Sequence, residues 1–139
     1  MNSDEKRAII SVSDKSYILD IVEFLTVNDY SIYSTGGTYK FIKDNIPTCN
    51  LFKISDLTGF PEILNGRVKT LHPKIYAGIL SIRKNKSHDK DLKKNNFRKI
   101  DLVIVNFYPF EKSLENKTNH NKIIENIDIG GPTMVRAAA

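Results

Sequence analysis

The hydrophobic positions of this chain fall into short β-branched runs that alternate with stretches of helical periodicity. The first run, residues 7–12, is short and rich in β-branched residues and predicts a buried strand. After the polar segment 13–16, which is rich in residues that cap helices, apolar residues recur at i, i+3, i+4 and i+7 and predict a helix. These residues are Ile18, Ile21, Val22 and Leu25.

The alternation continues along the rest of the chain. We expect further strands at residues 32–34, 51–54, 77–82 and 101–107, and helices at 38–43, in the basic segment after residue 82 and from Gly130 onward. The strand at 101–107 has four consecutive apolar residues, Leu102 to Val105, which is typical of a sheet covered on both faces. The polar segment 115–121 is expected to be an exposed connection.

This order of elements predicts an α/β fold. Parallel strands require crossovers, and helices supply them, so we expect three α/β/α layers with a mainly parallel sheet. At 139 residues the chain has the size of one domain, and we expect residues 1–139 to form a single unit. In such a sheet, ligands bind outside the carboxyl ends of the strands.

The amino-acid composition argues against a membrane protein and against a metal site. The chain is 40% hydrophobic and 27% charged, and it contains neither a secretion signal nor an apolar run of about 18 residues. We therefore expect no membrane association and a cytoplasmic location. Cys49 is the single cysteine and is interpreted as a small buried hydrophobe, and the three histidines lack metal-ligand spacing, so no metal is expected.

The net charge of +5 is concentrated in the segment 83–94. A basic segment can contact nucleic acid, but this one has no interleaved aromatic residues. A solvated helix face explains it equally well, and nucleic-acid binding is not expected.

Residues suited to binding an anion follow the predicted strands. Ser13 and Lys15 follow the first, the sequence Ser-Thr-Gly-Gly-Thr at 34–38 follows the second, and Tyr108 follows the last. Glycines let backbone N–H groups approach a phosphate, and a helix that begins there adds unpaired donors. A tight turn capped by Thr38 is the alternative interpretation, and the pattern leaves both open. Neither a P-loop nor a dinucleotide fingerprint is present, so a mononucleotide-sized ligand fits better.

A second basic stretch is Gly-Arg-Val-Lys-Thr-Leu-His-Pro at 66–73. In an extended segment, Arg67 and Lys69 would project to one side and Thr70 to the other, so two cations would converge on one point. A solvated surface loop is the alternative. His72 is interpreted as a hydrogen-bonded structural residue rather than a catalyst, while Tyr108 and Asp128 have packing and capping as alternatives.

Five motifs together resemble the inosine monophosphate (IMP) cyclohydrolase domain. This domain is the N-terminal part of the bifunctional purine-biosynthesis protein that also carries an aminoimidazole carboxamide ribotide (AICAR) transformylase. The motifs are SVSDK at 11–15, STGGT at 34–38, DLTGFPEILNGRVKTLHPKIYAGIL at 56–80, NFYPF at 106–110 and IDIGGPTMVRAAA at 127–139. They cover the chain from about residue 7 to its end.

The resemblance implies a methylglyoxal synthase-like fold and a hydrolase acting on a cyclic amidine. Its small-molecule nucleotide substrate, 5-formamido-imidazole-4-carboxamide ribotide (FAICAR), loses water to give IMP. No cofactor or metal is implied, and a homodimer with a covalently linked AICAR transformylase domain is implied for the full-length protein. Because the family continues past RAAA with a lysine assigned to proton transfer, we expect this chain to be truncated at Ala139, to lack the transformylase and to be impaired.

The resemblance also assigns site residues, by matching motifs. Phosphate and ribose contacts fall on Ser13, Asp14, Lys15, Thr35, Gly36, Gly37 and Thr38. The remaining substrate contacts fall on Arg67, Val68, Lys69, Thr70, Val105, Asn106, Asp128 and Ile129. In ring closure, we expect Lys69 to stabilise the tetrahedral oxyanion, with Tyr108 and Asp128 assisting proton exchange and Arg67 beside them.

Two alternatives share this fold. Methylglyoxal synthase releases phosphate from a triose phosphate, and it would call for catalytic carboxylates at strand ends in place of the Arg67 and Lys69 pair. A regulatory module, like the allosteric domain of carbamoyl phosphate synthetase, would keep the anion cradle without chemistry.

Overall fold

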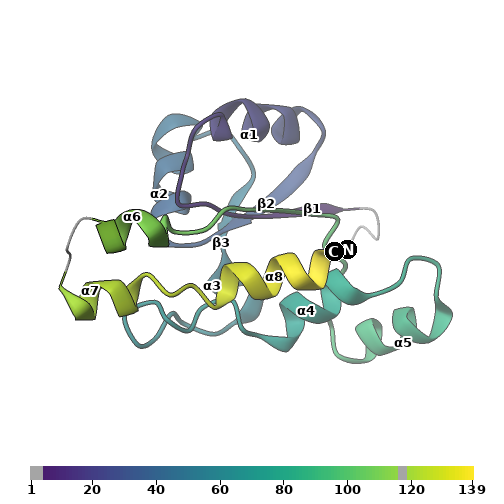
Figure 1. Ribbon diagram of the computed structural model, residues 1–139. Coiled ribbons are helices and arrows are strands. Elements are labelled where there is room, and N and C mark those ends of the chain that lie inside the picture. Colours follow the sequence, from purple (N-terminus) through teal and green to yellow (C-terminus); the bar gives the residue numbers. More distant parts are fainter. Residues whose placement is uncertain (1–4, 116–118) are drawn as a thin grey trace.

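The computed structural model describes residues 5–115 and 119–139 and centres on a four-stranded parallel sheet (Figure 1). The strands are β1 (Lys6–Ser11), β2 (Tyr30–Ser34), β3 (Leu51–Lys53) and β4 (Leu102–Val105), in the order β3-β2-β1-β4. Ile9 of β1 lies opposite Tyr33 on one side and Val103 on the other. The predicted parallel sheet is therefore confirmed.

Helices cover both faces of this sheet. Those of the described chain are α1 (Ile18–Val27), α2 (Gly36–Asn45), α3 (Ile54–Thr58), α4 (Pro73–Leu80), α5 (Lys86–Lys94), α6 (Phe110–Glu115), α7 (His120–Glu125) and α8 (Gly130–Ala138). Figure 1 shows α1 and α2 on one face and α3, α4 and α8 on the other. The predicted α/β/α layers are thus confirmed, and the expected helices at 38–43, in the basic segment and from Gly130 all exist.

Two hydrophobic cores explain why β1 shows no polar alternation. Ile10 packs with Val22 of α1 on one face, whereas Ile9 packs with Ile75 of α4 and Met134 of α8 on the other, and all five side chains are fully buried. The buried Cys49 belongs to the first core, as predicted. Burying apolar surface on both faces of one strand fixes the two helix layers against the sheet.

The strand with the most continuous apolar run lies at the edge of the sheet. Alternate residues of β4 contact the two cores, as expected, yet each of them is only half-buried. An edge strand has a strand neighbour on one side only, and this explains the incomplete burial of β4.

The prediction of a strand at 77–82 is wrong, because most of this segment lies in α4. Pro73 occupies the first turn of α4, and Nδ1 of His72 accepts a hydrogen bond from the Lys74 N–H at 3.1 Å, so a helix begins here. The structural role expected for His72 is confirmed. Gly78 allows α4 to pack closely, since a Cβ at this position would lie 2.6 Å from the Arg98 carbonyl oxygen.

Two loop predictions need correction or qualification. The expected polar cap of α1 is replaced by Tyr17, which has φ 61° and makes no side-chain capping bond. The connection expected at 115–121 instead includes the end of α6 and the start of α7, and residues 116–118 lie outside the described residues. No helix in the described part of the chain is both long and apolar enough to cross a membrane.

Candidate functional site

A pocket of about 430 Å³ lies at the carboxyl ends of β1, β2 and β4, where the parallel sheet predicts a ligand site. We name it the strand-end pocket. The residues expected at the site that line it are Ser13, Lys15, Thr35, Gly37, Thr38, Arg67, Lys69, Thr70, Asn106, Tyr108, Asp128 and Ile129. The structure does not place Asp14, Gly36, Val68 or Val105 in its lining.

One wall of the strand-end pocket is the turn from β2 into α2. Thr35 precedes the helix in an extended conformation, and Gly36 has φ +36°, a backbone conformation that a side chain disfavours. A Cβ added to Gly37 would meet no atom within 4 Å. Packing of the described protein atoms therefore does not require glycine at position 37. The first N–H groups of α2 have no partner within the helix and provide donors for an anion.

The Thr38 hydroxyl is not a free donor, contrary to expectation. It donates to the Val12 carbonyl oxygen at 2.9 Å and accepts from the Val12 N–H at 3.2 Å, and the residue is 4% exposed. The capping alternative is also wrong, because Thr35 occupies the N-cap position of α2. Thr38 instead anchors the end of β1 to α2.

Asn106 fixes the loop that follows β1. Its Oδ1 accepts hydrogen bonds from the N–H groups of Ser13 at 2.7 Å and Asp14 at 3.1 Å, while its Nδ2 donates to the Asp14 carbonyl oxygen at 2.7 Å. The Lys15 ammonium group donates to the Ser13 carbonyl oxygen at 3.2 Å and stays beside the same loop. A side chain at the end of β4 thus shapes the loop at the end of β1.

The opposite wall depends on two glycines at the start of α8. A Cβ at Gly130 would collide with the Thr70 hydroxyl, and one at Gly131 would overlap with the Asp128 carboxylate. Oδ1 of Asp128 accepts a hydrogen bond from the Gly131 N–H at 3.0 Å. Ile129 occupies the N-cap position of α8, but Asp128 satisfies an N–H group in its first turn, as the capping alternative proposed. Asp128 also lines the strand-end pocket.

The basic stretch is not extended as expected. Residues 64–67 form a turn with positive φ at Leu64, Asn65 and Gly66, so Arg67, Lys69 and Thr70 line the same pocket rather than opposite sides. The guanidinium group of Arg67 forms an ion pair with the carboxylate of Glu125.

Sequence reasoning missed Glu125 and the contribution of α7. The only cue was that Glu125 lies three residues before Asp128, a predicted site residue. Other pocket residues that were not predicted are Ser11, Val12, Asn65, Gly66, Ile124, Ile127, Gly130 and Gly131. Glu125 adds a negative charge to a wall that was expected to be basic.

Within residues 5–115 and 119–139, no group of three or more His, Cys, Asp or Glu side chains could hold a metal ion. The strand-end pocket instead combines ammonium, hydroxyl, amide and carboxylate groups. Such a set can bind an anion at one wall and exchange protons with a bound molecule at the other.

Comparison with known proteins identifies the family. The chain is 52% identical over 135 residues to the bifunctional purine biosynthesis protein PurH of Thermoanaerobacter sp. (strain X514) and 52% identical to that of Clostridium beijerinckii. These alignments cover 96% and 97% of the chain but 26% of each relative. The resemblance to a bifunctional purine-biosynthesis protein is thus confirmed.

Structural comparison agrees with this result. A crystal structure of a protein named ForH has a TM-score of 0.78 and 31% identity, and the match covers 96% of this chain and 66% of ForH. A family model described as the MGS-like domain matches residues 17–133, which include strands β2, β3 and β4 and most of the residues that line the strand-end pocket. The chain therefore belongs to the MGS-like domain family.

Proposed function

We propose that this chain is an IMP cyclohydrolase that closes the purine ring of FAICAR to give IMP and water. The observation that carries the proposal is the composition of the strand-end pocket. An anion cradle at Lys15 and Gly37 shares one volume of about 430 Å³ with Lys69, Tyr108 and Asp128. Membership of the MGS-like family and similarity to proteins of purine biosynthesis support the same conclusion.

The reaction forms one C–N bond and expels one oxygen. The carboxamide nitrogen attacks the formyl carbon, and the tetrahedral intermediate places negative charge on the formyl oxygen. That oxygen leaves as water after taking one proton that originates on the carboxamide nitrogen and one that originates on the formamido nitrogen. An amide nitrogen is a poor nucleophile, so the site must orient it, stabilise the oxyanion and transfer protons.

The basic and acidic groups of the opposite wall suit these tasks. We assign Lys69 to stabilising the oxyanion and delivering a proton to it. Tyr108 and Asp128 are assigned to proton exchange with the attacking carboxamide. Arg67 is paired with Glu125 and can exchange this carboxylate for a polar group of the substrate. A single oxyanion donor typically contributes about 10²–10³-fold in rate.

The anion cradle is assigned to the 5′-phosphate and ribose. The N–H groups at the start of α2 and the Lys15 ammonium group supply donors, and the loop held by Asn106 supplies Ser13 and Asp14. Gly36, Val68, Val105 and Ile129 complete the substrate contacts that we propose. Fixing the phosphate at one wall brings the reacting groups together at the other, and orientation is a large part of catalysis in a ring closure.

The direct test is to incubate the purified chain with FAICAR and to monitor the absorbance of the hypoxanthine ring. Appearance of IMP at a rate above that of FAICAR alone, and its loss in Lys69→Ala, is the expected result. Release of inorganic phosphate from a triose phosphate would instead identify a methylglyoxal synthase. Binding of IMP with no turnover of FAICAR would identify a regulatory module.

Assembly and location belong to the same proposal. We propose a cytoplasmic homodimer, linked in the full-length protein to an AICAR transformylase domain. This chain spans 26% of the length of the PurH relatives, and their bifunctional name supports a second activity outside the matched region. Light scattering coupled to size-exclusion chromatography would give the mass of the assembly, and a mass of one chain would contradict the homodimer.

A further inference from the structure

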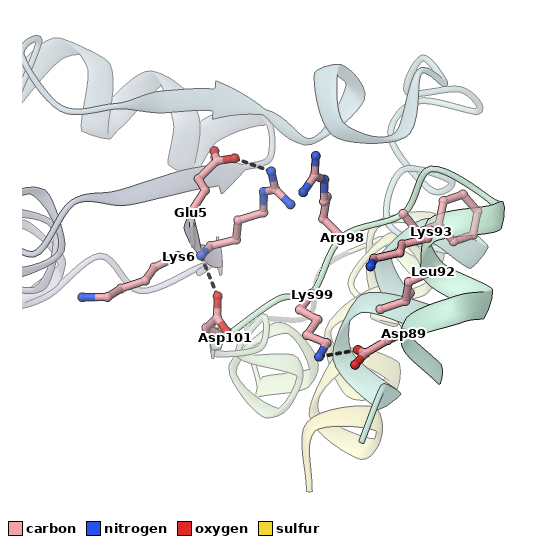
Figure 2. Close-up of a pocket in the computed structure, with 10 residues that line it drawn as sticks. Glu5, Lys6, Asp89, Leu92, Lys93, Arg98, Lys99 and Asp101 are labelled. Atoms are coloured by element: carbon pink, nitrogen blue, oxygen red, sulfur yellow. Dashed lines mark hydrogen bonds and ion pairs between the residues drawn. The ribbon is translucent and has the colours of Figure 1, made fainter. Parts of the chain in front are cut away.

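A second pocket, of about 330 Å³, lies at the amino ends of β1 and β4. It is separated from the strand-end pocket by the length of β1, which is roughly 16 Å for six residues. We name it the strand-start pocket. It is lined by residues 5–7, by Phe97, Arg98, Lys99 and Asp101, and by one face of α5 (Figure 2).

The carboxylates of the strand-start pocket are already engaged. Glu5 forms an ion pair with Arg7, and Asp89 forms one with Lys99 at 2.6 Å. Asp101 pairs with Arg83, a residue outside the pocket lining, at 2.9 Å. These pairs leave the remaining lining cations without a carboxylate of their own.

Three lining cations remain, and one of them, Lys6, donates a hydrogen bond to the Asn28 carbonyl oxygen at 3.3 Å. The other two are Arg98 and Lys93. Neither side chain takes part in an ion pair or hydrogen bond within the part of the chain that the structure describes. Figure 2 shows the Arg98 guanidinium group at the same end of the pocket as the Glu5 carboxylate. Burial opposes ionisation of Glu5, but the Ser31 hydroxyl and the charges of Arg7 and Arg98 hold the pKa of its carboxyl below the ordinary value.

Arg7 adds a buried donor. Its side chain is 10% exposed, and its Nε is buried without a hydrogen-bond partner in the described ranges. Because almost all buried donors in proteins are paired, this N–H is a candidate contact for a bound acceptor. A guanidinium group binds oxyanions through two parallel N–H groups, and here only one nitrogen is taken by Glu5.

We propose that the strand-start pocket binds a phosphate group, held by Arg7, Arg98 and Lys93. A phosphate carries more than one negative charge at neutral pH and several acceptor oxygens, so it balances both unpaired cations and reaches the Arg7 Nε–H. The volume of the pocket suits a ligand no larger than a sugar phosphate. This site does not depend on the proposed function of the strand-end pocket.

The site can be observed directly by NMR spectroscopy. Inorganic phosphate and ribose 5-phosphate would each be titrated into the ¹⁵N-labelled chain in chloride buffer, following the Nε–Hε resonance of Arg7, which is assigned by its loss in Arg7→Lys. A saturable shift of this resonance is expected. Tighter binding of ribose 5-phosphate indicates a phosphorylated metabolite, whereas equal affinities indicate free phosphate. No shift with either probe would overturn the proposal.

A matched pair of variants separates a built site from general charge attraction. Arg98→Gln is expected to weaken phosphate binding at this resonance at least ~10-fold. Lys94→Gln removes the same charge from an exposed residue of α5 outside the pocket lining. Its phosphate affinity should stay within about 2-fold of the wild-type value. Equal weakening by both would refute the site. If Arg98→Gln fails to fold, the exposed Lys93→Gln allows the same comparison with Lys94→Gln.

Discussion

The Asn106 side chain accepts a hydrogen bond from the Ser13 backbone N–H at 2.7 Å, joining two residues that are 93 positions apart in the sequence. With its two bonds to Asp14, this side chain determines the conformation of the loop after β1. Asn106 therefore positions the protein groups of this loop that we assign to ligand binding.

Replacing Asn106 should lower both the stability of the protein and its affinity for the ligand. Asn106→Ala removes three hydrogen bonds and is expected to lower the free energy of unfolding by about 1–2 kcal/mol, as measured by urea denaturation. The affinity for IMP should fall as well, because the β1 loop loses its fixed shape. Asn95→Ala, which removes one local bond to Asp91, is the control. Unchanged IMP affinity in Asn106→Ala would contradict the positioning role.

Gly37→Ala should separate ligand binding from stability. The new methyl group meets no protein atom within 4 Å, and alanine favours a helix over glycine by up to about 1 kcal/mol, so the variant should be as stable as the wild type or more stable. In the bound state the methyl group would obstruct the phosphate, so calorimetry should show weaker IMP binding.

The contrasting control is Gly59→Ala. Gly59 has φ +72° and does not line the strand-end pocket, so this change should reduce stability by about 1 kcal/mol without altering IMP affinity. Normal IMP binding by Gly37→Ala would remove the turn after β2 from the proposed phosphate site.

Lys69→Ala should reduce turnover of FAICAR by at least ~100-fold while leaving IMP affinity nearly unchanged, because the ammonium group is assigned to the oxyanion rather than to the phosphate. Steady-state kinetics combined with IMP titration makes the distinction. Lys40→Ala removes the same charge at an exposed position outside the pocket and should retain full activity. Near-normal turnover by Lys69→Ala would exclude Lys69 from the chemistry.

The ion pair between Arg67 and Glu125 should compete with the substrate for Arg67. Both side chains are about half-exposed, so Glu125→Gln should change the free energy of unfolding by less than ~1 kcal/mol. Removing the carboxylate releases Arg67 and relieves repulsion of an anionic ligand, so IMP should bind several-fold more tightly. Glu23→Gln, an exposed change on α1, is the control. Weaker binding by Glu125→Gln would show that Glu125 itself serves the ligand.

Burial raises the pKa of the Cys49 thiol above its ordinary value. The native state therefore holds the thiol proton more strongly than the unfolded chain does. This contribution to stability is fully present below the pKa of the unfolded thiol, about 8.5, and is lost as the pH rises through the higher folded value. A chromogenic disulfide reagent at pH 8 should react far more slowly with the native chain than in urea, and equal rates would contradict this burial.

The sequence predicted the sheet and helices α1, α2, α5 and α8, but not α3, α6 or α7. The successful predictions rest on periodicities, as in β1 and α1, that tertiary packing reinforces. The prediction failed at α4, whose apolar residues resemble a strand over a short window. The informative signals were His72 and Pro73 before the helix, together with Gly78, which is required by the close approach of the Arg98 backbone rather than by a turn. Local pattern does not reveal such a long-range contact.

The place of the site was predicted from the strand ends, and most of its residues from the resemblance of the motifs. The structure brings Lys15, Gly37, Lys69 and Asp128 into one pocket. The spacing of residues along the sequence did not predict which groups pair with which side chains. The hydroxyl of Thr38 serves Val12, and a turn with positive φ brings Arg67 beside Glu125, and neither pairing follows from neighbouring residues.

Because β4 comes late in the sequence, the parts of this domain cannot all fold at the same time during synthesis. β1, β2 and α2 can pair as soon as they leave the ribosome, but the loop after β1 acquires its fixed shape only when Asn106 arrives. Closing so long a segment is entropically costly and slow compared with local helix formation. A nascent chain that has not yet added its edge strand would therefore be compact but incompetent to hold a nucleotide.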